Sequence, residues 1–154
     1  MNLVLAHDYL VQMGGAERVV AAMHRAFPRA PIYTSAVARR TLVDDFSDAN
    51  IRASWMQALP WITHHTHFKK YFALYPFAFR SFGTIEADVA WISSSTFAKF
   101  LKFSPATRTV CYLHNTTRFL WQTDEYLDYE VARGPINEAV RSILPGLREA
   151  DLFA

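Results

Sequence analysis

The stretch "NLVLAHDYLVQMGGAERVVAAMHRAFPRAPIYTS", residues 2–35, decides the fold. Residues 2–7 form a short apolar run bounded by polar residues, which is typical of a buried strand. Across 14–28, apolar side chains recur at helical spacing, and Pro28 marks the end of the expected helix. These side chains are Ala16, Val19, Val20, Met23 and Phe27. Residues 30–35 read as a second strand, so the stretch predicts a βαβ unit with parallel strands and a right-handed crossover.

Further strand-like runs extend this pattern. They occupy residues 51–54, 88–93 and 108–114. Residues 150–154, "ADLFA", resemble the start of another strand, and a chain that stops there reads as part of a longer one. The sequence therefore predicts an α/β class, with a Rossmann-like, mostly parallel sheet flanked by helices.

Helices are expected between these strands. An aromatic segment, 61–82, repeats its rings at helical spacing, but Pro76 cannot sit inside one helix. We expect two helical pieces that meet near Tyr75. A short helix capped by serine is expected at 94–103. A longer one is expected at 135–150, interrupted near Pro145 and Gly146.

The composition is that of one globular domain. The chain has 154 residues, of which 51% are hydrophobic, and its single cysteine, Cys111, reads as a small buried side chain. The start carries no basic segment typical of a signal peptide, and one cysteine favours a reducing compartment. The uncharged run "YFALYPFAF" is too short to span a bilayer. These features lead us to expect a cytoplasmic protein.

Charge is unevenly placed along the chain. Residues 49–123 hold two acids, Glu86 and Asp88, against eight bases, together with 16 of the 23 aromatic residues. Such a basic, aromatic centre indicates an anionic partner, which can be a phosphate, a nucleotide or an anionic membrane surface. The alternative is a solvated basic face over an ordinary core.

Three polar clusters follow predicted strands. They are His7 and Asp8 with Gly14 and Gly15; then Ser93, Ser94 and Ser95; then His114, Asn115, Thr116, Thr117 and Arg118. In open parallel sheets, ligands bind outside the carboxyl ends of the strands. If these strands are parallel, the three clusters share one rim and form the candidate site.

The glycine pair opens the first predicted helix. Glycine lets a ligand approach the backbone closely, and a helix start offers unpaired N–H groups that suit a phosphate. The motif is neither G-x-G-x-x-G nor a Walker loop, so it also fits a plain glycine-rich helix start. Glu17 in the first turn favours the helix dipole in either case.

Two side chains of the third cluster suggest ligand contacts. His114 can hydrogen-bond a sugar hydroxyl or orient a reacting group, or it is a satisfied histidine at a strand end. Arg118 can hold a phosphate or carboxylate, or form a surface salt bridge. The run "HHTH", 64–67, does not predict a metal site, because adjacent histidines rarely point at one ion and no acid lies nearby.

Taken in order, four motifs resemble one enzyme family. "HDYLVQMGGAERVV", "FPRAPIYTS", "ISSSTFAKF" and "CYLHNTTRFLW" are similar to the N-terminal domain of retaining GT-B glycosyltransferases of the family-4 type, including bacterial mannosyltransferase-like members. The resemblance covers nearly the whole chain. It implies that residues 1–154 are the acceptor-side, Rossmann-like domain.

The resemblance also implies roles for individual residues. Gly14 and Gly15 match the loop that approaches the donor diphosphate, and His114 matches a histidine that contacts the transferred sugar. The cleft and acceptor side is matched by Asp8, Ser93, Ser94, Ser95, Arg118 and Trp121. The family commonly has Thr-Pro after the histidine where this chain has Asn115 and Thr116, so the loop differs there.

The family's donor-binding, C-terminal domain is not contained in these residues. The resemblance implies that this domain is a partner, along with a nucleotide-diphosphate sugar and a glycan or lipid-linked acceptor. It implies that the sugar is transferred with retention of its anomeric configuration, without a metal ion or other cofactor. Nucleic acid is not an expected partner. The isolated half is expected to be inactive.

Two other functions stay open. The chain can be a non-catalytic module that binds a nucleotide or phosphate. It can also dock on a membrane: Lys69, Lys70, Arg80 and Phe77 suit the anionic inner face of a membrane that carries a lipid-linked acceptor. The alternative reading of this segment is that Phe68, Tyr71, Phe72 and Tyr75 pack on the sheet.

Overall fold

A computed structural model describes residues 1–64, 67–115, 118–122 and 135–152. The chain divides into two compact units, Met1–His114 and Asn115–Ala154, and each is described by itself. The first unit contains the sheet and all residues of the first two predicted clusters. The second consists of helices in its described part.

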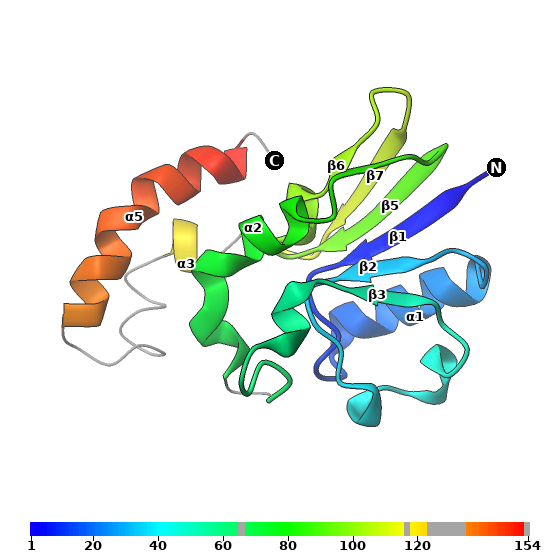
Figure 1. Cartoon of the computed structure of the whole chain (residues 1–154), viewed down its shortest axis with the longest axis horizontal. Coiled ribbons are helices and arrows are strands. Elements are labelled where there is room, and N and C mark those ends of the chain that lie inside the picture. Colours follow the sequence, from blue (N-terminus) through cyan, green and yellow to red (C-terminus); the bar gives the residue numbers. More distant parts are fainter. Residues whose placement is uncertain (65–66, 116–117, 123–134, 153–154) are drawn as a thin grey trace. The chain divides into compact units, whose positions relative to one another are not determined.

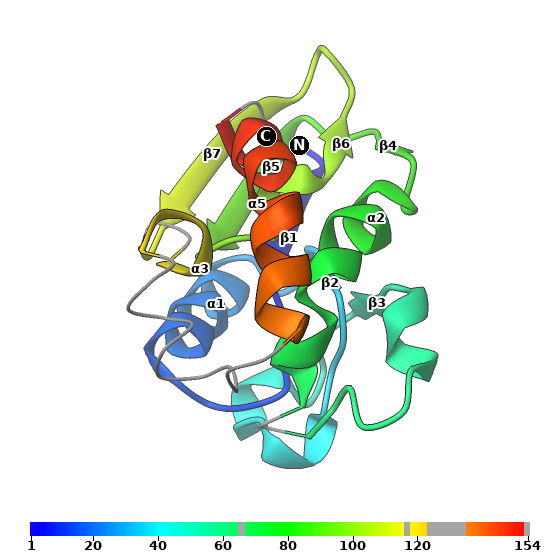
Figure 2. The same cartoon turned by 90° about the vertical axis from the view of Figure 1, so that its left-hand side faces the viewer.

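The first unit is built on a parallel sheet of five strands in the order β3-β2-β1-β5-β7 (Figure 1). The strands are β1 (Leu3–His7), β2 (Ile32–Thr34), β3 (Ile51–Ala53), β5 (Val89–Ser94) and β7 (Arg108–Leu113). Figures 1 and 2 show β3 and β7 at the two edges. A separate parallel pair is formed by β4 (Thr84–Ile85) and β6 (Lys102–Phe103). The predicted α/β, Rossmann-like class is confirmed, and every pair in the sheet is parallel.

The helices alternate with these strands. In the first unit they are α1 (Gly15–Ala26), α2 (Tyr75–Arg80) and the 3-10 turns η1 (Arg39–Thr41), η2 (Asp44–Phe46), η3 (Trp55–Ala58), η4 (Phe68–Leu74) and η5 (Ala98–Phe100). The second unit contains α3 (Arg118–Trp121) and α5 (Pro135–Leu152). No helix among the described residues is long and apolar enough to cross a membrane.

The central strand β1 separates two halves of the sheet. The chain leaves β1 through α1 to reach β2 on one side, whereas β5 pairs on the other side. The strand order therefore reverses between β1 and β5, the position where open α/β sheets bind ligands. His7, the last residue of β1, stands opposite Thr34 on one side and Ser93 on the other.

Strand alternation sets which side chains meet α1. Leu3 and Leu5 of β1 lie in one buried cluster with Val20 and Met23 of α1. Successive strand residues point to opposite faces, so His7 faces the same side as Leu5, and Asp8 faces the other. The apolar stripe predicted for the first helix is thus confirmed as its packing face.

The two-piece prediction for the aromatic segment is also confirmed. η4 ends at Leu74 and α2 begins at Tyr75. Pro76 stands in the first turn of α2, where its missing N–H would have had no partner within the helix. Phe68 and Tyr75 are buried. This part of the aromatic stripe therefore packs inward, which agrees with the alternative in which these rings belong to the core.

The helix predicted at 94–103 is wrong. Ser94 ends β5, and only the short turn η5 precedes β6. The backbone N–H groups after Ser94 bind the carboxylate of Asp8, as detailed below, and β6 pairs with β4. Contacts between distant segments therefore outweigh the local helical pattern.

The predictions for the C-terminal segment are wrong in two respects. α5 continues through Pro145 and Gly146 without a break, and it runs to Leu152 where a strand was expected. Leu144 is buried beside this proline, and Arg148 Nε donates a hydrogen bond to the Leu120 carbonyl of α3 at 2.6 Å. Packing of α5 on α3 outweighs the backbone hydrogen bond that a proline removes. Residues 153–154 lie outside the described residues.

Cys111 is exposed, not buried as predicted. It lies in β7, whose six residues are all exposed. The predicted strand is present, but β7 is an edge strand that pairs with β5, and its side chains are not covered.

Candidate functional site

Three residues from the ends of three strands meet in the first unit. Ser93 Oγ lies 2.7 Å from His114 Nε2 and 3.2 Å from His7 Nδ1. The sequence predicted that the carboxyl ends of these strands share a rim, and the parallel sheet brings them together. Ser93 therefore links the two histidines.

The tautomer of His7 follows from its contacts. His7 Nδ1 lies 2.8 Å from the backbone carbonyl oxygen of Ser93, which can only accept a hydrogen bond. Nδ1 must then carry the proton. The other ring nitrogen, Nε2, is buried and has no hydrogen-bond partner among the described residues.

The free nitrogen of His7 faces a buried carboxylate. His7 Nε2 lies 4.0 Å from Glu17 Oε1, too long for a hydrogen bond but close for an electrostatic contact. Burial would raise the pKa of Glu17, but nearby His7 and backbone N–H groups, including that of Gly14, outweigh it and lower the pKa. Glu17 is therefore ionised at neutral pH.

Gly14 accommodates that carboxylate. The Gly14 N–H donates to Glu17 Oε2 at 2.8 Å, and a Cβ on Gly14 would stand 2.9 Å from the same oxygen. The φ of Gly14 is −116°, a backbone conformation open to any residue, so a larger side chain there would only have to displace the Glu17 carboxylate. Gly15 is exposed with no atom within 4 Å of a Cβ position. An incoming ligand can thus reach the backbone at Gly15, whereas the N–H of Gly14 is already bound.

Asp8 holds the loop that follows β5. Its buried carboxylate accepts hydrogen bonds from the Ser94 hydroxyl and from four successive backbone N–H groups, at 2.7 to 3.0 Å. Those N–H groups belong to Ser95, Thr96, Phe97 and Ala98. The side chains of Asp8 and Ser94, which the resemblance assigned to the cleft, are engaged inside the fold. They fix the position of Ser93 and Ser95.

His114 lies just beyond β7 and is partly exposed. Its N–H donates to the Ser94 carbonyl at 3.0 Å, which fixes it beside the end of β5. Partial burial and the proximity of His7 lower the pKa of His114 and outweigh the opposing effect of Asp8 and Glu17. The ring is therefore mostly neutral at pH 7 and can donate or accept a hydrogen bond.

The remaining predicted site residues belong to the second unit. Arg118 begins α3, but its side chain lies outside the described residues, as do Thr116 and Thr117. The indole N–H of Trp121 donates to Asp151 Oδ2 at 3.0 Å, and the guanidinium of Arg148 stands 5.9 Å from its ring centre. Trp121 thus helps to join α3 to α5. In "HHTH", His65 and Thr66 also lie outside the described residues.

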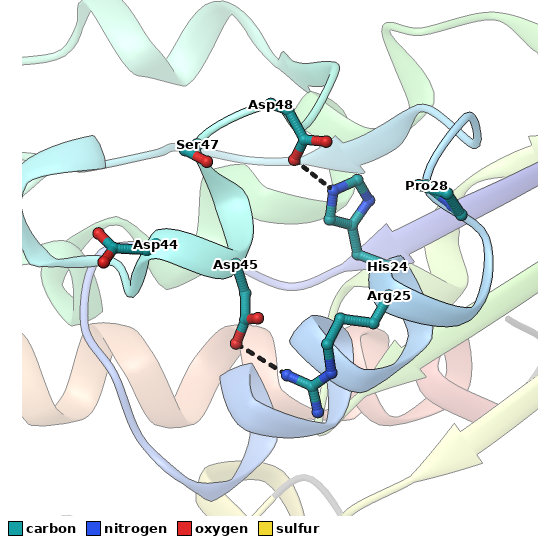
Figure 3. A pocket seen from close by; sticks show the side chains of 7 residues that line it. All are labelled: His24, Arg25, Pro28, Asp44, Asp45, Ser47 and Asp48. Atoms are coloured by element: carbon teal, nitrogen blue, oxygen red, sulfur yellow. Dashed lines mark hydrogen bonds and ion pairs between the residues drawn. The ribbon is translucent and has the colours of Figure 1, made fainter.

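A second polar cluster surrounds a pocket of about 440 Å³ at the C-terminal end of α1 (Figure 3). His24 Nε2 binds Asp48 Oδ1 at 3.2 Å and Arg25 Nη1 binds Asp45 Oδ2 at 2.7 Å. The hydrogen bond from His24 lowers the pKa of Asp48. The His24 ring also stacks on buried Phe46. These pairs fasten the η2 segment to α1, which is a structural task.

The sequence pointed to His114 and the glycine pair but missed the role of Glu17. Its position in the first helical turn was explained by the helix dipole alone. The signal was the spacing: Glu17 stands three residues after Gly14, where a side chain reaches back to the helix start. His7 was placed in the right cluster because it ends the first strand.

Comparisons with protein families, with curated proteins and with solved structures found no match to this chain. Within the described ranges, no group of three or more histidine, cysteine, aspartate or glutamate side chains is placed to hold a metal ion. The function of the site is therefore inferred from the positions and contacts of its own residues.

Proposed function

We propose that this chain is the acceptor-side part of a retaining GT-B glycosyltransferase. It would take part in the transfer of a sugar from a nucleotide-diphosphate sugar to a glycan or lipid-linked acceptor. The observation that carries the proposal is the His7–Ser93–His114 cluster at the carboxyl end of β1, β5 and β7. It lies where the strand order reverses and beside the glycine-rich start of α1.

In this proposal, His114 contacts the transferred sugar. Its neutral ring hydrogen-bonds a sugar hydroxyl, and Ser93, 2.7 Å away, sets the orientation of the ring. Ser93 is in turn fixed by His7, whose Nδ1–H donates a hydrogen bond to the Ser93 carbonyl oxygen. This arrangement suits positioning of a neutral polyol, for which preorganised hydrogen bonds give orientation at little entropic cost.

The start of α1 serves the diphosphate of the donor. Gly15 leaves the backbone open, and the helix start carries partial positive charge. Ionised Glu17 opposes a dianion at this place, but its Oε2 is bound by the Gly14 N–H within the fold. The stronger phosphate contacts would come from the donor-binding domain that the resemblance implies.

The proposal is tested by nucleotide release and by product configuration. The natural gene product is incubated with a panel of nucleotide-diphosphate sugars and candidate acceptors, and released nucleoside diphosphate is measured. We expect His114→Ala to lower the rate at least about 100-fold, because a positioning hydrogen bond at the reacting sugar is lost. His64→Ala, in an exposed segment, is the matched control. NMR of the product must show the same anomeric configuration as the donor.

The competing function makes a different prediction. A non-catalytic nucleotide-binding module would bind free nucleoside diphosphates tightly through the 154-residue chain, without turnover. NMR titration of the chain with these nucleotides separates the two. Tight binding that His114→Ala leaves unchanged, together with no nucleotide release by the gene product, would overturn the transferase proposal.

A further inference from the structure

Tyr112 is an exposed aromatic residue beside the candidate site. It belongs to β7, at the edge of the sheet, and is 51% exposed. The roles proposed above for His7, Ser93 and His114 do not involve it. A tyrosine ring carries a large apolar surface and a polar tip, so a ring with this much open surface can contact a ligand.

Strand register places Tyr112 on the same face of the sheet as the His7–Ser93–His114 cluster. Tyr112 stands opposite Ser93, and Ser93 stands opposite His7 on its other side. Residues opposite each other in parallel strands point to one face, as do residues two apart along one strand. The ring centre of Tyr112 accordingly lies 4.9 Å from that of His114, at an angle of 60°. The tyrosine ring and the cluster are therefore adjacent parts of one surface.

The contacts of His114 fix it relative to this ring. Its Nε2 lies 2.7 Å from the Ser93 hydroxyl, and its backbone N–H donates to the Ser94 carbonyl at 3.0 Å. Ser93 has too short a side chain to cover the ring of Tyr112 from the side of β5. On the other side of β7, no further strand pairs with it in the described part of the chain. The ring is thus open while its neighbour is held in place.

The two side chains offer a ligand different contacts. Tyr112 offers an apolar ring, and the imidazole of His114 offers a hydrogen bond. Burial and the proximity of His7 lower the pKa of His114, so this imidazole is mostly neutral at pH 7 and has little attraction for a phosphate. A sugar ring matches both contacts, because C–H groups line its faces and hydroxyl groups project from its rim. Aromatic walls with a few well-placed polar groups are usual in such sites.

We propose that Tyr112 is a specificity-determining residue whose ring stacks on the C–H face of the sugar that His114 contacts. The choice of a sugar as the ligand rests on the proposed transferase function. Such stacking selects among sugars, because an axial hydroxyl interrupts the apolar face of the sugar ring. A nucleobase also stacks on tyrosine and is the competing ligand.

The first test is an NMR titration of the 154-residue chain carrying isotope-labelled tyrosine. The probes are methyl glucoside, methyl mannoside and methyl galactoside, and Tyr112→Phe identifies the signal of Tyr112. We expect this signal to shift in a saturable way with at least one glycoside. Sorbitol, which has hydroxyl groups but no ring, should leave it unchanged.

Matched variants locate the contact, with saturation transfer to the glycoside as the measure of binding. Tyr112→Leu should weaken binding about five-fold, because an aromatic stacking contact contributes roughly that much. Tyr112→Phe keeps the ring and should bind like the parent. Leu113→Ala is the control, since Leu113 is also 51% exposed in β7 but points to the opposite face. It should bind like the parent, and circular dichroism checks that every variant is folded.

Turnover by the natural gene product gives a second readout. With the nucleotide-diphosphate sugar that it uses, Tyr112→Leu should raise KM for this donor about five-fold with little change in kcat. The reason is that stacking acts equally on the bound sugar and on the transition state. If the parent releases no nucleotide with any donor, the transferase proposal fails, whereas the NMR titration still decides whether Tyr112 contacts a sugar.

Several results would overturn the role of Tyr112. One is that no glycoside shifts its NMR signal. Another is that Tyr112→Leu binds glycosides, or turns over the donor, with the constants of the parent. Equal weakening by Leu113→Ala would also overturn it, because the effect would not belong to the face that carries His114. Tighter binding of adenosine, guanosine or uridine than of every glycoside would identify a nucleobase as the ligand instead.

Discussion

Asp8, just after β1, and Ser94, at the end of β5, are joined by a hydrogen bond of 2.7 Å from the serine hydroxyl to the buried carboxylate. The same carboxylate accepts hydrogen bonds from four backbone N–H groups of the loop that follows β5. Asp8→Asn would replace one acceptor oxygen by an NH₂ group that faces these donors. We expect a loss of about 3 kcal/mol in the free energy of unfolding, because buried donors lose a charged acceptor.

Urea denaturation followed by circular dichroism measures this loss. Asp44→Asn is the matched control, because Asp44 is exposed in η2. We expect the control to change stability by less than about 0.5 kcal/mol, as surface substitutions usually do. Equal stability of the two variants would show that the Asp8 carboxylate does not hold the loop.

Glu17 gives the first unit an acid-sensitive contribution to stability. Its pKa in the fold lies below the ordinary value of 4.5. The stabilisation is therefore present above pH 4.5 and is lost as pH falls through the lower, folded-state pKa. In urea titrations between about pH 5 and 3, Glu17→Gln should lose less stability than the parent. The exposed Glu86→Gln should follow the parent curve, and a Glu17→Gln curve that also did so would contradict this linkage.

His114 should titrate below the ordinary histidine pKa of 6.5. Burial and His7 lower its pKa, while Asp8 and Glu17 act in the opposite direction. His7→Gln should therefore raise the pKa of His114, and Glu17→Gln should lower it further. Imidazole proton shifts measured by NMR across a pH series report both changes. A His114 pKa above 6.5 in the parent, or shifts of the same sign in both variants, would refute the assignment.

Pro145 weakens the helix that contains it. Pro145→Ala restores a backbone N–H within α5, so the second unit should gain about 1 to 3 kcal/mol, since an interior proline costs roughly 3 kcal/mol. Slower hydrogen exchange of α5 amides would show the gain. Pro105 provides the control, because it lies in a turn closed by the hydrogen bond from Thr107 N–H to the Ser104 carbonyl. Pro105→Ala should give no gain, and equal effects of the two changes would count against the helical explanation.

Periodicity was enough to predict the elements of the first unit that pack through regular patterns. The apolar stripe of α1 and the buried run of β1 are examples, because each repeat matches the geometry of its element. Even the break at Tyr75 followed from the chemistry of Pro76. The carboxyl-end rule then brought His7, Ser93 and His114 together.

The wrong or missing predictions have a common cause, which is contact between residues that are far apart in sequence. Asp8 binds the backbone some ninety residues later and prevents the helix expected after Ser94. Arg148 ties α5 to α3 across Pro145. The link from Glu17 to His7 spans ten residues and appears only when α1 folds onto β1. No local pattern contains such information.

The place of β7 at the sheet edge has a consequence for how the protein behaves at high concentration. In the described part of the chain, β7 pairs on one side with β5, so its outer row of backbone N–H and C=O groups can recruit a further strand. Val110, Tyr112 and Leu113 are more than half exposed along it. Edge-to-edge self-association is therefore a hazard during purification, and a lysine introduced at Val110 should reduce it.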